Sequence, residues 1–120
     1  MKVAIPRMGE TVAPCFEYCA TMAIFTIEDR QITDQVDFPL RSRGPLDRVR
    51  LLRGQQVETI ICGGVQNVYE DLVRASGIQM ISWVSGSVDD LLDLFTRGRL
   101  VAGTEREDQA GRDVPRTDTP

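Results

Sequence analysis

The cysteines of this chain are its strongest candidates for metal binding or thiol chemistry, because the sequence has no histidine. Cys15 and Cys19 lie in the stretch VAPCFEYC, and Cys62 directly precedes the glycine pair Gly63 and Gly64. Thiolates bind soft metals and iron–sulfur units, so three cysteines without imidazole match such a cluster better than they match calcium or magnesium. We therefore predict Cys15, Cys19 and Cys62 as metal ligands.

The cysteine spacing leaves several kinds of site open. C-x-x-x-C differs from the C-x-x-C of zinc knuckles and thioredoxin-like redox pairs, and an ordinary four-iron site needs a fourth cysteine. An open iron position, a bound sulfide or thiolate, or ligands shared across a dimer could complete the set. The alternative is a thiol-redox or regulatory module without a cluster, in which Glu17 or a helix terminus would have to serve as base. Any single cysteine could also be a small buried hydrophobe.

The strands that position these cysteines are predicted from apolar runs. The run KVAIP over residues 2–6 is a central first strand, and residues 7–20 have no sustained period and are expected to form a long loop. Two β-rich runs flank the polar pair Asp29 and Arg30, as in a tight hairpin. The five predicted strands span residues 2–6, 21–28, 31–38, 58–62 and 78–83.

Three helices are predicted from apolar spacing and end signals. Leu46, Val49 and Leu52 follow a helical period that stops at Gly54, and a second period over residues 68–73 ends at Gly77. Ser87, with an aspartate three residues later, predicts the start of a third helix over residues 88–96.

This order of elements predicts an α/β fold with helices on both faces of a mixed five-stranded sheet. Right-handed crossovers give the strand order 3-2-1-4-5 with strand 2 antiparallel. The carboxyl ends of strands 1 and 4 then form a topological switch point, where open α/β sheets bind ligands. We expect all three thiols to converge there. Gly63 and Gly64 lead into a helix N-terminus that suits an anion, although a tight strand-to-helix turn is the favoured explanation for the glycines alone.

Composition limits the classes of partner and the domain organisation. The chain has 120 residues, of which 42% are hydrophobic, and a net charge of −4. We expect one domain over residues 1–102 and a flexible polar tail over residues 103–120. The arginines at positions 41, 43, 48, 50 and 53 are predicted to form a solvated face, so nucleic acid is not an expected partner. Without a spanning apolar run or signal peptide, we expect a cytoplasmic protein with no membrane partner.

Several ordered motifs resemble the dinitrogenase iron–molybdenum cofactor family. They are KVAIP, VAPCF, AIFTIE, TIICGGV, LVRASGIQMI and GSVDDLLDLFTRGRL, and the resemblance extends over nearly all of residues 1–102. The resemblance implies a ribonuclease-H-like three-layer fold. It also implies binding of a preformed iron–sulfur, iron–molybdenum or molybdenum–sulfur cluster by a nitrogenase accessory protein, rather than turnover of a substrate. Cluster donor or acceptor proteins are the implied partners, and either a monomer or a homodimer is compatible with this role.

The first loop departs from the family pattern at two positions. The family commonly reads S-P-H-F-G there, whereas this chain has Cys15 in the histidine position and Glu17 in the glycine position. Cys15 and Phe16 are carried over from that motif as cofactor-binding residues, with Gly63 and Gly64 from the ICGG motif. Cys19 falls outside the common motif. A nuclease activity, which the fold alone could suggest, is disfavoured because the central strands lack the acidic residues that two-metal chemistry needs.

Overall fold

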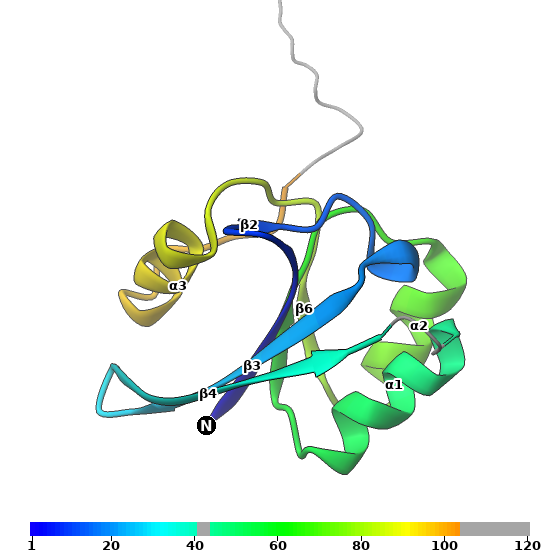
Figure 1. The fold of residues 1–120 in the computed structure, drawn as a ribbon, viewed down its shortest axis with the longest axis horizontal. Helices are drawn as coiled ribbons and strands as arrows, with labels where there is room; N and C mark the ends of the chain where they lie inside the picture. The colour runs from blue at the N-terminus through cyan, green and yellow to red at the C-terminus, as the bar shows by residue number, and fades with distance from the viewer. Residues whose placement is uncertain (41–43, 104–120) are drawn as a thin grey trace, which may run out of the picture.

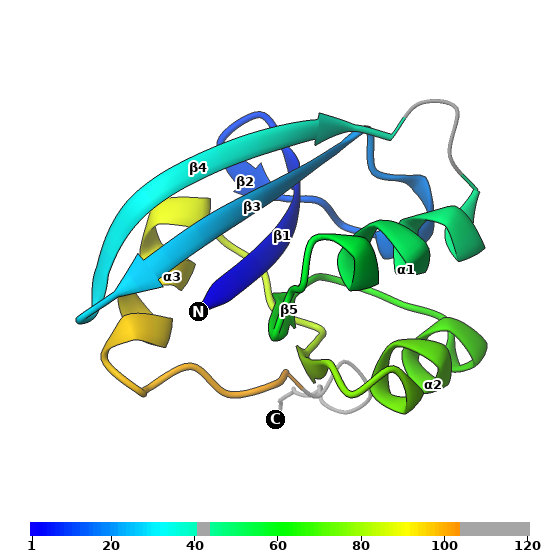
Figure 2. The ribbon, with the colours of Figure 1, turned by 90° about the horizontal axis from the view of Figure 1, so that it is seen from below.

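The computed structural model describes residues 1–40 and 44–103, and in these residues a mixed sheet is covered by helices on both faces (Figures 1 and 2). The sheet path is β4-β3-β1-β5-β6, and β2 pairs with β1 outside this path. The strands are β1 (Lys2–Met8), β2 (Thr11–Val12), β3 (Thr21–Glu28), β4 (Gln31–Pro39), β5 (Thr59–Ile61) and β6 (Gln79–Ile81). The helices are the short 3-10 helix η1 (Phe16–Tyr18), α1 (Pro45–Gly54), α2 (Asn67–Ala75) and α3 (Val88–Thr96).

The central strand β1 is buried because both faces of the sheet are covered. It pairs antiparallel with β3 and parallel with β5. Ala4 and Ile60 pack in a core under α1 and α2, which contribute Leu52 and Val73 to it. Val3, Ile5 and Ile61 point to the other face and pack under α3. Figure 1 shows the resulting three layers, with α3 on one side of the sheet and α1 and α2 on the other.

The predicted α/β fold with helices on both faces is confirmed, and the five-strand path follows the predicted order with β3 antiparallel to β1. The sheet differs from the prediction by one additional strand, β2. The expectation of one long loop over residues 7–20 is wrong, because β1 continues to Met8 and the segment contains β2 and η1. Gly9 adopts a φ of +61°, which lets the chain reverse and pair Arg7 with Val12. A strand of two residues is too short to produce a periodic signal.

The two most local predictions agree closely with the structure. The β3–β4 hairpin turns at Asp29 and Arg30, which have φ values of 54° and 65°, as a tight hairpin turn requires at both central positions. The third helix spans Val88–Thr96 as predicted, and the Ser87 hydroxyl accepts a hydrogen bond of 3.1 Å from the Asp90 amide. The tail is expected over residues 103–120, of which 104–120 lie outside the described residues, so the domain boundary stays a prediction. Among the described residues no helix is long and apolar enough to cross a membrane.

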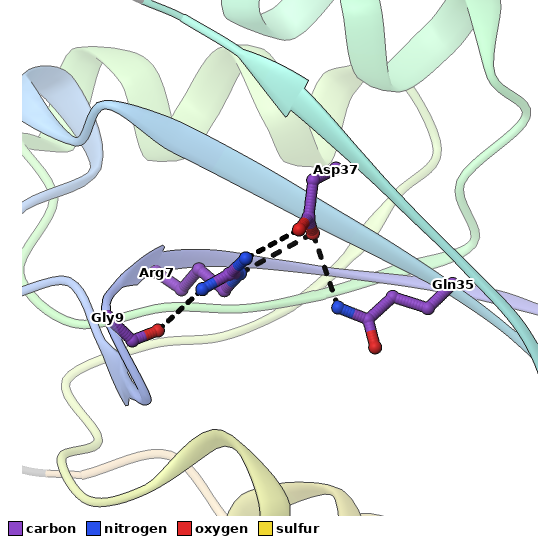
Figure 3. A network of polar contacts seen from close by, with 4 residues as sticks. All are labelled: Arg7, Gly9, Gln35 and Asp37. Atoms are coloured by element: carbon purple, nitrogen blue, oxygen red, sulfur yellow. Dashed lines mark hydrogen bonds and ion pairs between the residues drawn. The ribbon is translucent and has the colours of Figure 1, made fainter.

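An ion pair ties the edge of the sheet to the turn that follows β1. Arg7 on β1 donates to Asp37 on β4, and its Nη1 donates to the Gly9 carbonyl at 2.6 Å (Figure 3). Gln35 Nε2 also donates to Asp37 at 3.3 Å. The Arg7 guanidinium holds the pKa of Asp37 below its usual value. The network therefore anchors the start of the segment that carries Cys15.

Candidate functional site

A cleft with a volume of about 520 Å³ lies where the segment after β2 meets the carboxyl ends of β5 and β6. The segment docks through backbone hydrogen bonds: the Gly64 amide donates to the Pro14 carbonyl at 2.7 Å, and the Phe16 amide donates to the Gly64 carbonyl at 2.8 Å. The chain therefore brings Cys15 to the predicted end of the sheet. The cleft is lined by Pro14, Cys15, Glu17, Gly64, Val65, Gln66, Asn67 and Trp83.

The two predicted glycines allow this close docking. A Cβ on Gly63 would lie 2.6 Å from the Ala13 carbonyl oxygen and 2.8 Å from that of Pro14. A Cβ on Gly64 would lie 3.0 Å from the Trp83 ring. Packing therefore accounts for both glycines, as the turn explanation anticipated. Gly64 also lines the cleft, and their assignment as cofactor-binding residues stays a prediction.

Cys15 is the most accessible of the three thiols. It lines the cleft and also a second cavity of about 360 Å³. Its Sγ donates to Glu17 Oε1 at 3.0 Å. Partial burial, and then this hydrogen bond to the carboxylate, raise the pKa of Cys15. Cys15 is thus a protonated thiol at the junction of two cavities.

Glu17 joins the cysteine segment to the start of α2. Only 5% of its surface is exposed, and its Oε2 accepts a hydrogen bond of 2.6 Å from the amide of Gln66, the residue that caps α2. A carboxylate is favoured there because a helix N-terminus carries partial positive charge. The sequence alone indicates Glu17 only as a possible base. The available signal was an acidic residue where the family motif has glycine.

Cys19 lies in the core behind the segment. Its exposed fraction is 5%, and Arg48 Nη1 donates to its Sγ and to the Phe16 carbonyl, each at 2.9 Å. Burial raises the pKa of Cys19, and the Arg48 guanidinium opposes that rise. Cys19 contributes to the wall of the second cavity, so it shares that cavity with Cys15.

The expectation that Arg48 belongs to a solvated arginine face is wrong, since only 4% of Arg48 is exposed. Arg50 and Arg53 are exposed as expected, whereas positions 41 and 43 lie outside the described residues. Arg48 stands three and four residues before Leu51 and Leu52, so it shares the buried face of α1. That spacing was the signal that sequence reasoning missed.

Cys62 and Phe16 are fully buried, each with an exposed fraction of 0%. Cys62 belongs to the same core as Cys19 and lines neither cavity beside Cys15. Burial raises the pKa of Cys62 to about 12. The Phe16 ring packs in this core, so Phe16 anchors the segment while its neighbours line the cleft.

The structure thus places the predicted ligands at different depths. Cys15 borders open space, Cys19 lies in the wall of the second cavity, and Cys62 lies within the core. In residues 1–40 and 44–103, no group of three or more histidine, cysteine or acidic side chains is arranged to hold a metal ion. The three-cysteine ligand set therefore stays a prediction.

Trp83 forms one wall of the cleft. Its φ of 62° lies in the left-handed region, which is uncommon for a bulky residue and is held here by surrounding contacts. Its amide donates to the Gly63 carbonyl at 2.9 Å. Trp83 is also the single tryptophan of the chain, so its emission reports on the cleft.

Solved structures with the same fold support this placement of the elements. The crystal structure of PH0822 superposes with a TM-score of 0.79 at 18% identity, covering 85% of this chain and 94% of the other. A Methanocaldococcus jannaschii protein provisionally described as a dinitrogenase gives 0.72 at 23% identity, covering 83% and 91%. A Thermotoga protein provisionally described as NifB gives 0.63 at 28% identity, covering 84% and 91%.

The sequence comparisons give a family model and no curated relative. A search of curated proteins found no match. The family model described as dinitrogenase iron-molybdenum cofactor matches residues 1–98, which is most of the 120-residue chain. The predicted resemblance is confirmed, and this chain belongs to the dinitrogenase iron-molybdenum cofactor family.

Proposed function

We propose that this protein binds a metal–sulfur cluster in the cleft beside Cys15 and serves as a cluster carrier or an assembly or storage accessory. The observation that carries the proposal is the position of Cys15, an accessible thiol at a cleft between the carboxyl ends of β5 and β6 and the start of α2. The family supports the class of ligand, since its description names an iron–molybdenum cofactor. The cluster is cargo in this proposal, so the role is binding rather than turnover.

The residues around Cys15 suit a ligand that supplies its own sulfur. A single cysteine cannot complete an iron coordination sphere, so a cluster held here brings bridging sulfides or shares ligands with a partner protein or a second copy. Cys15 must give up its proton to become a ligand. Cys19 is the nearest further candidate, because it lines the second cavity with Cys15. Its Sγ would first have to leave the hydrogen bond with Arg48.

The thiol environments favour binding over thiol-redox chemistry. Reactive cysteines have a depressed pKa, which increases the thiolate fraction at neutral pH. Burial and the Glu17 hydrogen bond instead raise the pKa of Cys15, and burial raises that of Cys19. Neither cysteine is activated as a nucleophile. The carrier hypothesis needs only an accessible ligand whose proton a metal can replace.

Cluster transfer requires a partner that reaches Cys15. The wall of the second cavity includes Tyr18 and Met8, both of which are exposed large side chains. Exposed aromatic and methionine side chains are common in protein interfaces. A cluster donor or acceptor protein docking on this rim would meet Cys15 directly.

Anaerobic reconstitution with iron, molybdate and sulfide tests the proposal. Iron, molybdenum and acid-labile sulfide are measured with the visible absorption spectrum for the wild type and for Cys15→Ser, Cys19→Ser and Cys62→Ser. We expect the wild type to gain metal, sulfide and a visible band, Cys15→Ser to lose at least about nine tenths of each, and Cys62→Ser to retain them. A colourless, metal-free wild type after reconstitution would refute cluster binding.

A further inference from the structure

We propose that Glu17 competes with the ligand for the same binding groups. Its carboxylate accepts a hydrogen bond from the Gln66 amide at the N-cap of α2, and an anionic metal–sulfur ligand must displace it to bind. This inference rests on the proposed function and concerns the selectivity of the same cleft. It makes Glu17 the residue that sets the affinity for thioanions. Neither the family description nor the sequence motifs assign it this role.

The position of the carboxylate carries the inference. Both Glu17 oxygens have partners in the cleft wall, with Oε1 accepting from Cys15 Sγ at 3.0 Å and Oε2 accepting from the Gln66 amide at 2.6 Å. Glu17 is 5% exposed and lies among the residues that line the cleft. The side chain therefore contacts both the accessible thiol and the amide of Gln66, the N-cap residue of α2. An anion held by Cys15 would use these same two groups.

Charge explains why the contact acts as competition. A helix N-terminus favours an anion through its amide donors and its partial positive charge. The Gln66 amide has one hydrogen, so it cannot form a full hydrogen bond to Glu17 and to a sulfide at the same time. A carboxylate that stays in place would also repel a dianion within a few ångströms. In both cases anion binding is weaker while Glu17 holds its position.

A purely structural cap is the competing explanation for the same contacts. Carboxylates near helix N-termini commonly stabilise the helix without any ligand. The two explanations differ in what removal of the charge does. If Glu17 only caps α2, its replacement lowers stability and leaves anion affinity unchanged or lower. If Glu17 competes, its replacement raises anion affinity.

Titration with tetrathiomolybdate, a soluble sulfur-bearing dianion, tests the inference. Binding to wild type, Glu17→Gln and Glu17→Ala is followed anaerobically by quenching of Trp83 emission, and bound molybdenum is measured after equilibrium dialysis. Glu17→Gln keeps the size of the side chain and removes its charge. Glu58→Gln is the matched control, since it removes one exposed charge directly before β5, outside the cleft lining. Circular dichroism melting checks that each variant is folded.

We expect Glu17→Gln and Glu17→Ala to bind tetrathiomolybdate at least about tenfold more tightly than wild type, and Glu58→Gln to match wild type. Binding by the Glu17 variants with none by wild type also supports competition. Equal binding by all four proteins overturns it and leaves the proposed function intact. If none binds but wild type loads a cluster on reconstitution, only the inference about Glu17 fails. If wild type also fails to load, both proposals fail.

A measurement on the wild type avoids dependence on variant folding. In nitrogen-15 correlation spectra, displacement of Glu17 changes the environment of the Gln66 amide, because that amide loses a hydrogen bond of 2.6 Å. We expect the Gln66 resonance to shift with tetrathiomolybdate at the same midpoint as Trp83 quenching. Quenching with an unchanged Gln66 resonance overturns the inference, because the anion would then bind without displacing the carboxylate.

Discussion

The cleft wall and the core directly behind it use the same side-chain types for different purposes. Cys15 lies at the cleft and is partly exposed, whereas Cys62 is fully buried and has a pKa raised to about 12. Charged residues show the same contrast: Glu17 lines the cleft, and Arg48 lies in the core bonded to Cys19 and to the Phe16 carbonyl. Depth in the fold therefore separates a candidate ligand from a structural group of the same residue type.

The contrast between cleft wall and core depends on a rigid core. Within that core, we expect the largest loss of stability when Arg48 is replaced. Arg48→Met keeps a long side chain but leaves the Phe16 carbonyl without this donor inside the protein. We expect a loss of about 3 kcal/mol in the free energy of unfolding, because a buried acceptor loses a charged partner. Urea denaturation measures it. Arg50→Met, at an exposed position on the same helix, should change stability by less than about 0.5 kcal/mol.

The second largest effect is expected at Gly63, which lets the cysteine segment dock closely against the end of β5. In Gly63→Ala the new Cβ would lie 2.6 Å from the Ala13 carbonyl oxygen, so the docked segment must move. Overpacking of this kind costs about 2 kcal/mol, and we expect cluster loading to fall with it. Thermal melting and metal analysis check both effects. Gly54→Ala, where a Cβ meets nothing within 4 Å, should leave stability unchanged or higher. Equal losses in the two variants would contradict the packing argument.

Cysteine substitutions separate the two regions most directly. Cys62→Ser places a hydroxyl in the core and should cost about 2 kcal/mol of unfolding free energy, while the folded protein still loads a cluster. Cys15→Ser should cost less than about 0.5 kcal/mol and abolish loading. Denaturation and reconstitution are measured on the same preparations. If Cys62→Ser folds normally and fails to load a cluster, Cys62 is a ligand and its assignment to the structural core is wrong.

The Arg7–Asp37 pair should have the smallest effect, because Asp37 is 38% exposed at the side chain and solvent screens the pair. The folded pKa of Asp37 is lowered by Arg7, so its contribution is present above the unfolded pKa of about 3.9 and is lost as the pH falls through the folded value. We expect Asp37→Asn to lose about 0.5 kcal/mol at pH 7 and nothing near pH 2. Urea denaturation across this range measures the difference. A variant that is equally destabilised at both pH values would show that the pair acts through packing.

Much of the fold could be predicted because its signals are local. The α3 boundaries follow from Ser87 and the apolar spacing after it, and the β3–β4 hairpin follows from two β-rich runs around two polar residues. The sheet path follows from element order and the handedness of crossovers. The β2 strand could not be predicted, since two residues pair with β1 only because Gly9 reverses the chain.

The groups available for chemistry can be read from the sequence alone: three cysteines without histidine, a glycine pair after β5, and an acidic residue in the family's glycine position. The depth of these groups and their partners depend on tertiary packing. Cys62 is buried because the end of β5 is covered on the α1 and α2 side, and Arg48 is buried because it shares a helix face with Leu52. Glu17 meets Gln66 across 49 positions of sequence, a distance over which no periodicity operates. Burial and long-range hydrogen bonding depend on packing of the whole chain, and no local pattern encodes them.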